Sequence, residues 1–166
     1  MGSRGNDDKH AKAAGRVLRQ LRLVFHTFKG HFRRIEAEVG VSGAQLWALS
    51  VVRDQPGLRL GALARAMDIQ QSTASNLIKP LVEGGFIVTS RPDGDRRIVE
   101  LQLTPMARAV LRKAPAPLGG VLPHALGKLP ADTLARLDED LEELIALLDA
   151  DRRDAQVPLG TGDMAR

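Results

Sequence analysis

Residues 58–104 constrain the fold of this chain more than any other stretch, because they hold two helical patterns followed by two strand-like ones. The first helical pattern ends at Met67, and the second runs from about Gln71 to Gly84-Gly85, a typical helix stop. Asp68 lies between the two patterns, and Asp tolerates the left-handed backbone conformation of a tight turn. The spacing therefore predicts a helix-turn-helix.

The outward face of the second helix carries short hydrogen-bonding side chains and one cation. A solvated helix more often carries Glu and Lys, which have a higher helix propensity than Ser, Thr or Asn. Short polar side chains can read base edges in the major groove, and a cation can contact a phosphate. From this face alone, an ordinary solvated surface is an equal alternative. The residues concerned are Gln71, Ser72, Thr73, Ser75, Asn76 and Lys79.

A β-hairpin is expected directly after this helix. Residues 86–90 and 99–103 are strand-prone, and Pro92, Asp93 and Gly94 between them supply the turn. Neighbouring arginines at a hairpin tip rarely help folding but suit a narrow, electronegative minor groove. A polar helix followed by a basic hairpin predicts a winged helix-turn-helix. The candidate wing residues are Arg91, Asp95, Arg96 and Arg97.

The sequences LARAMDIQQSTASNLIKPLVEGGFI and DGDRRIVELQLT resemble the MarR family of bacterial transcriptional regulators, whose wing carries the pattern D-x-R-x-x-x-x-x-L-T. The resemblance extends more weakly over residues 14–150. It implies that Arg96 enters the minor groove, while Asp95 and Arg97 brace the wing by ion pairing. It also implies a homodimer controlled by a small, often aromatic or anionic, effector. Pro80 departs from the pattern and predicts a kink in the second helix.

Helical patterns flank the winged element on both sides. Residues 11–39 and the end of residues 105–150 carry apolar side chains at heptad spacing, as in helices that pack on a partner. Prolines and glycines predict a broken helix over residues 105–127. We expect a mainly α fold with a small β-wing and dimerisation helices at both ends; an intramolecular bundle is the alternative. The predicted regions are a flexible terminus (1–10), a protomer (11–150) with its winged element at about 43–104, and a disordered tail (151–166).

Charge is distributed unevenly along the chain. Residues 1–34 contain nine Lys or Arg and two Asp, whereas residues 130–166 contain ten acidic and four basic residues. A basic N-terminal part and an acidic C-terminal part favour a protein that approaches a polyanion in one orientation. Chance variation of helix surfaces is the competing explanation.

Several classes of protein are excluded or disfavoured by what the sequence lacks. The absence of cysteine excludes disulfides, thiolate metal sites and cysteine nucleophiles. The four histidines lie in no metal-binding or catalytic pattern, so we expect no enzyme, cofactor or metal. Without a spanning apolar run or a signal-peptide pattern, the expected location is cytoplasmic.

The leading functional hypothesis is a homodimeric regulator, most simply a repressor, that binds a pseudo-palindromic double-stranded DNA operator. The alternative is a winged-helix module for interaction or dimerisation that has no operator. An effector site is expected where the first two helices meet residues 105–127. Core packing is the competing role for each of its candidates, which are Phe28, His31, Phe32 and Trp47.

Overall fold

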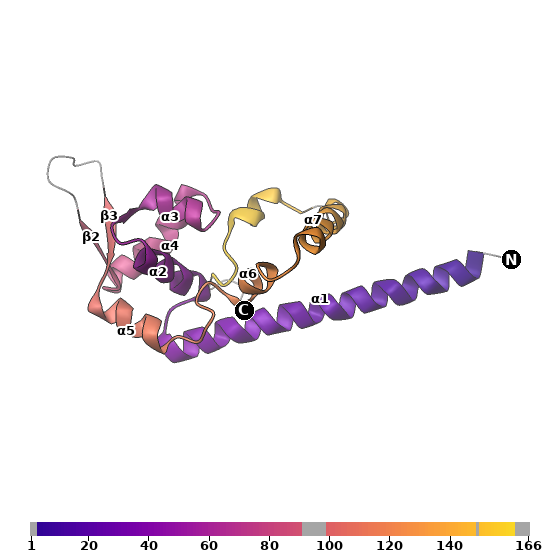
Figure 1. Ribbon diagram of the computed structural model, residues 1–166, viewed down its shortest axis with the longest axis horizontal. Helices are drawn as coiled ribbons and strands as arrows, with labels where there is room; N and C mark the ends of the chain where they lie inside the picture. Colours follow the sequence, from indigo (N-terminus) through magenta and orange to yellow (C-terminus); the bar gives the residue numbers. More distant parts are fainter. Residues whose placement is uncertain (1–2, 91–98, 149, 162–166) are drawn as a thin grey trace.

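The computed structural model describes residues 3–90, 99–148 and 150–161, with only the backbone of residues 3–5. It is mainly helical, and one long helix projects from a body of shorter helices and a small sheet (Figure 1). The helices are α1 (Ser3–Val39), α2 (Gly43–Asp54), α3 (Leu60–Ala66), α4 (Gln71–Glu83), α5 (Pro105–Lys113), α6 (Val121–Leu126), α7 (Ala131–Ala146) and the 3-10 helix η1 (Arg152–Gln156). The strands are β1 (Leu58–Arg59), β2 (Ile87–Ser90) and β3 (Glu100–Leu103).

The core of the body is built from unbranched and branched aliphatic side chains. They come from α1 to α4, the sheet and α5, so burial ties the winged element to the end of α1. None of the largest fully buried side chains in the described residues is aromatic. These are Ile35, Leu46, Leu49, Leu63, Met67, Leu81, Ile87, Leu101 and Val52.

The expected helix-turn-helix is confirmed. Asp68 joins α3 to α4 with φ 53°, the left-handed conformation that the turn requires. The Ile69 N–H then donates to the Ala64 carbonyl at 2.9 Å, which closes the turn. The inward side chains of α4 are buried, and α4 continues through Pro80 to Glu83. The turn and the buried face together fix which side of α4 points outward.

Side-chain caps fix the starts of two other helices, α2 and α5. Ser42 and Gln45 form a reciprocal capping box at the start of α2. Thr104 caps α5: its hydroxyl accepts from the Ala107 N–H and donates to the Gly85 carbonyl at 2.8 Å. Thr104 thus connects the start of α5 to the end of the turn that follows α4.

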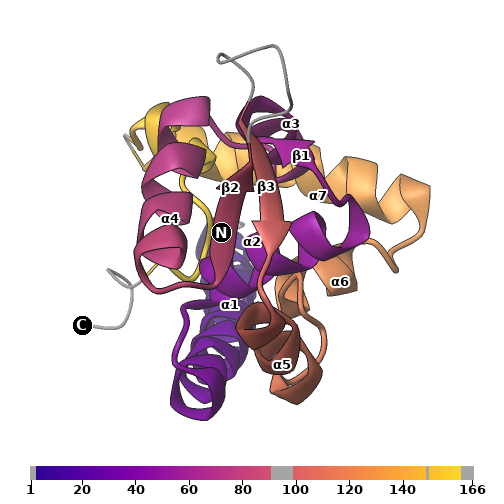
Figure 2. The ribbon, with the colours of Figure 1, turned by 90° about the vertical axis from the view of Figure 1, so that its left-hand side faces the viewer.

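The three strands form an antiparallel sheet in the order β1-β3-β2. Ile87 pairs with Leu103 and Ser90 with Glu100, which gives the two arms of the expected hairpin. In Figure 2, α4 lies to one side of this hairpin. The short strand β1 is not predicted, because two residues carry no detectable alternation of polar and apolar side chains.

The expected break in the helix over residues 105–127 is confirmed. α5 ends at Lys113, and a turn containing a cis Ala116–Pro117 bond leads to α6, which begins after Gly120 at φ 94°. Glycine suits that positive φ because it has no Cβ. α6 then packs beside α1 (Figure 1).

Helix α1 begins earlier than the sequence pattern indicates. It starts at Ser3 and includes residues expected to be flexible, and an Asp8–Lys12 pair at 2.7 Å supports this first part. Phe28 and Ile35 in its second half are buried against the body. The part of α1 that precedes Phe28 projects away and leaves apolar side chains such as Phe25, 53% exposed, without cover.

The C-terminal segment also differs from the expectation of disorder, over residues 151–161. The Asp151 side chain accepts from the Arg153 N–H to start η1, and Arg152 pairs with Glu142 at 2.8 Å. The Gly160 carbonyl accepts from the Ala44 N–H at 3.4 Å, and Pro158 is buried. These contacts are tertiary, so the polar composition of the segment does not reveal them.

Candidate nucleic-acid interface and ligand cavity

The polar face predicted for α4 lies on the surface. Gln71, Ser72, Ser75, Asn76 and Lys79 are exposed, and Thr73 is partly exposed. Ala74, Leu77, Ile78 and Leu81 occupy the opposite, buried face, so the helix is held rigidly with its polar side chains outward. Such a face can donate to and accept from an external partner without unfolding.

The electrostatics of this face suit an anionic partner. The first turn of α4 contains no acidic residue, and Gln70 provides no side-chain cap for its N–H groups. The positive end of the helix dipole and these N–H groups therefore favour a negative charge nearby. Lys79 adds a cation two turns further along the same surface.

The hairpin of β2 and β3 lies beside α4 (Figure 2). Ser90 and Glu100 form the last pair before the tip. The wing candidates Arg91, Asp95, Arg96 and Arg97 lie outside the described residues. Their role therefore stays a prediction from the sequence.

A cavity of about 380 Å³ lies beneath the helix-turn-helix, within the size range of small-molecule sites. Four parts of the chain form its wall: the end of α1 with the start of α2, the α3–α4 turn, the start of α6, and the C-terminal segment. The lining residues are Phe32, Gly43, Trp47, Met67, Asp68, Ile69, Gly119, Gly120, Val121, Leu122, Pro123, Leu126, Ala155, Val157, Pro158 and Leu159.

The structure separates the four candidate effector residues into two pairs. Phe32 and Trp47 line the cavity, at the predicted junction of the first two helices with the segment after α5. Phe28 and His31 are buried beside it, with ring centroids 5.7 Å and 6.3 Å from that of Phe32. Phe28 and His31 therefore support Phe32 from behind.

His31 is the buried titratable group of this region. Burial lowers the pKa of its imidazole below 6.5; a hydrogen bond with the Pro117 backbone opposes the shift, and the charge of Arg34 adds to it. Its Nε2 has no hydrogen-bond partner among the residues that the structure describes. His26, five residues earlier, is exposed, so the two imidazoles do not share a face.

Several lining residues were not found from the sequence. Met67, Asp68 and Ile69 are recognisable as a turn, but not as a cavity wall. Val157, Pro158 and Leu159 come from the segment expected to be disordered. Only the packing of this segment onto α2 brings them to the cavity, and no local pattern carries that information.

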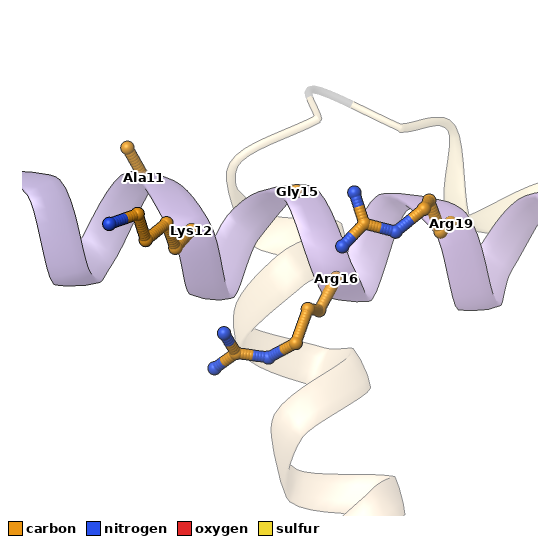
Figure 3. Close-up of a pocket in the computed structure, with 5 residues that line it drawn as sticks. All are labelled: Ala11, Lys12, Gly15, Arg16 and Arg19. Atoms are coloured by element: carbon orange, nitrogen blue, oxygen red, sulfur yellow. The ribbon is translucent and has the colours of Figure 1, made fainter.

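A second hollow lies on the projecting part of α1. Lys12, Gly15, Arg16 and Arg19 surround it, and all of its residues belong to one helix (Figure 3). A hollow without an opposing wall cannot enclose a small ligand. We interpret it as a basic helix surface.

Other classes of site are not found in the part of the chain that the structure describes. Within residues 3–90, 99–148 and 150–161, no three His, Cys, Asp or Glu side chains lie close enough to hold a metal ion. Over the same residues, no helix combines the length and the apolar character needed to cross a membrane.

Comparison with known proteins identifies the family. Residues 39–98 match the model of the MarR family. A protein of Thauera aromatica, assigned as a transcriptional regulatory protein for the hcr operon, is 31% identical over 152 residues; the match covers 90% of this chain and 87% of that protein.

Solved structures agree on the fold. BpsR of Bordetella bronchiseptica, whose DNA binding is regulated by 6-hydroxynicotinic acid, is 26% identical with a TM-score of 0.52, covering 81% of this chain and 94% of BpsR. A variant of S. aureus MepR bound to an oligodeoxyribonucleotide has a TM-score of 0.51 at 18% identity, covering 80% and 98%. Its similarity concerns the fold alone. With the helix-turn-helix, the hairpin and these relatives in agreement, the chain belongs to the MarR family of winged helix-turn-helix transcriptional regulators and is not an enzyme.

Proposed function

We propose that this regulator binds a pseudo-palindromic DNA operator as a homodimer, represses transcription there, and is released by a small organic effector. The observation that carries the proposal is the exposed polar face of α4, which lacks acidic residues in its first turn and is backed by a rigid apolar core. The alternative of an interaction module without an operator is not favoured, because the relatives are named as transcriptional regulators.

In the proposed complex, α4 enters the major groove and the hairpin reaches the neighbouring minor groove. Asn76 and Gln71 can each bind adenine through two hydrogen bonds, whereas Lys79 contacts a phosphate. Ser72, Thr73 and Ser75 supply single contacts to bases or phosphates. The wing arginine assigned to the minor groove is Arg96.

Two apolar surfaces without cover support the homodimer. The projecting part of α1 exposes Val17, Leu18, Leu23, Val24 and Phe25, and α7 exposes Leu134 and Leu141. No residue of α7, which is described throughout, is buried in the single protomer. Surfaces of this kind are typical of helices that are covered by a partner.

Charge complementarity indicates how two copies would meet. Helix α1 carries nine basic and four acidic residues, and α7 carries six acidic residues and one arginine. Two α1 helices repel each other, and so do two α7 helices. If α1 of one copy packs against α7 of the other, opposite charges meet and the exposed apolar side chains of both helices are covered. The basic surface around Gly15 on α1 is suited to the acidic helix α7 (Figure 3).

The position of the cavity suggests how effector binding can change DNA affinity. Met67, Asp68 and Ile69 form part of its wall and lead directly into α4. A ligand that prefers one position of this turn changes the position of α4 in both protomers. Such a ligand lowers DNA affinity only by binding the DNA-free form more tightly.

Selection from a pool of random duplexes tests the operator proposal. The purified full chain should enrich an inverted repeat whose half-sites are centred about one helical turn, roughly 34–36 Å, apart. A variant in which Gln71 and Asn76 are both replaced by Ala should enrich no such repeat. Equal recovery of all sequences by the unmodified chain would contradict the proposal.

A further inference from the structure

We infer that the cavity takes a lipophilic organic cation, with its apolar body among Phe32, Trp47 and Leu122 and its positive end at Asp68. The inference rests on the proposed effector role of the cavity and assigns the ligand's chemical class. It follows from the composition of the wall, because Asp68 is the single charged residue among its described residues.

The wall favours an apolar ligand body. Two aromatic rings, Phe32 and Trp47, face aliphatic side chains from α6 and from the C-terminal segment. The Phe32 ring is fixed between Gly43 and Gly160, and the Trp47 indole lies against Gly119. Rings held in this way present apolar surface without losing further side-chain entropy on binding.

The wall also opposes an anionic ligand. A carboxylate in this cavity loses hydration and meets no Lys, Arg or His in the described wall. The Asp68 carboxylate adds repulsion, because it has the same charge. An organic acid is therefore expected to bind more weakly than a neutral compound of the same shape.

A cation gains from two features of the same wall. Asp68 forms no ion pair with any described residue, so its carboxylate is available to an incoming ammonium group. Trp47 and Phe32 present ring faces or edges that also attract a positive charge. Because Asp68 is exposed to solvent, the ion pair contributes only part of the affinity.

Asp68 connects this recognition to the DNA-binding helix. It occupies the left-handed turn at φ 53°, three residues before α4 begins. An ammonium group bound at Asp68 shifts the α3–α4 turn, and this turn sets the position of α4. Charge recognition and release of DNA would then use the same residue.

Three compounds with one bicyclic body separate the ligand classes: 1-(aminomethyl)naphthalene, 1-(hydroxymethyl)naphthalene and 1-naphthoate. Calorimetric titration of the full chain at pH 7 should give the tightest binding for the amine and the weakest for the acid. We expect at least about a tenfold difference between the amine and the acid, because the buried carboxylate lacks a partner.

Two variants locate the effect. Asp68→Asn keeps a side chain that tolerates positive φ, and it should reduce the preference for the amine over the alcohol by about two- to fivefold, the range of an exposed ion pair. Glu83→Gln removes an equal charge at the end of α4 and should leave that preference unchanged. Tightest binding of the acid, binding of none of the three compounds, or equal preferences in both variants would each overturn the assignment.

The same samples distinguish this inference from the proposed function. DNA binding that persists while the acid is the best ligand rejects only the ligand class. A chain that binds the amine through Asp68 yet enriches no duplex keeps the ligand class and rejects the operator. Displacement of enriched duplex by the amine, and its loss in Asp68→Asn, is the result expected if both hold.

Discussion

The ring of Phe32 lies so close to Gly160 that a methyl group at residue 160 would stand only 2.7 Å from Phe32 Cε1. The C-terminal segment is thus brought against the second half of α1 at one aromatic side chain. Gly160 also has φ 83°, a conformation that other residues rarely adopt. The wall that the C-terminal segment adds to the cavity depends on this glycine.

Gly160→Ala should release the C-terminal segment while leaving the core folded. The positive φ alone costs roughly 1–2 kcal/mol for a residue with a Cβ, and contact with Phe32 adds to that cost. Trypsin should therefore cleave after Arg152 or Arg153 at least about fivefold faster, since cleavage requires η1 to open. Gly30→Ala is the matched control, because nothing lies within 4 Å of a methyl group there. Equal cleavage rates in both variants would exclude this role for Gly160.

The burial of His31 predicts a loss of stability in mild acid. Its pKa is lowered in the folded protein, so the folded form binds a proton less readily than the unfolded form. The two forms are equally neutral well above pH 6.5; as the pH falls below that value, the unfolded form gains protons first and stability decreases. Chemical unfolding measured between pH 7.5 and 5 should show a shallower decrease in His31→Gln than in the exposed control His26→Gln. If the unfolding free energies of the two variants decreased in parallel with pH, the loss of stability would not come from His31.

Phe25→Glu should weaken the proposed dimer. Phe25 is exposed on the projecting part of α1, so a charge there costs the single protomer little but must be desolvated under a partner. Sedimentation at micromolar concentration should shift from dimer toward monomer, while the helical circular dichroism signal persists. Gln20→Glu introduces the same charge on the same helix and serves as the comparison; an unchanged dimer in Phe25→Glu would exclude this surface.

The elements that sequence analysis predicts well are those specified by neighbouring residues. Asp68 and Gly85 adopt φ 53° and φ 72° directly after α3 and α4, and each marks a helix end through its own backbone preference. The polar face of α4 follows from helical spacing alone. Fold class and the candidate DNA-binding residues on α4 could therefore be placed before the structure.

The remaining features depend on residues far apart in the chain. β1 exists because Leu58 pairs with Leu101, and the cavity exists because Pro158 reaches the region of Phe32 and Trp47. The ordered conformation of residues 151–161 depends on contacts with Glu142 and Ala44, which are far away in the sequence. A prediction from polar composition alone misses these contacts and therefore gives disorder. The scarcity of aromatic side chains singles out Phe32 and Trp47, whereas nothing in the sequence marks Asp68 as a ligand contact.

Arg96→Ala tests the wing, which the sequence alone assigns. The variant should fold and dimerise normally and bind operator DNA more weakly. The slope of log affinity against log salt concentration should become shallower by about one unit, since one cationic contact is lost. Arg112→Ala removes a cation from α5 and provides the control. An unchanged slope and affinity in Arg96→Ala would reject the wing assignment.

Recognition of DNA sequence by α4 is tested most directly by the ratio of the affinity for operator DNA to the affinity for a scrambled duplex. Fluorescence anisotropy at one salt concentration should give a ratio for Asn76→Ala that is about 5- to 150-fold smaller than for the unmodified chain, because one bidentate base contact contributes about 1–3 kcal/mol of discrimination. Lys79→Ala should weaken both duplexes alike and keep the ratio, as expected for a phosphate contact. A ratio that is the same in the unmodified chain, Asn76→Ala and corresponding variants of Gln71, Ser72, Thr73 and Ser75 would contradict sequence recognition by α4.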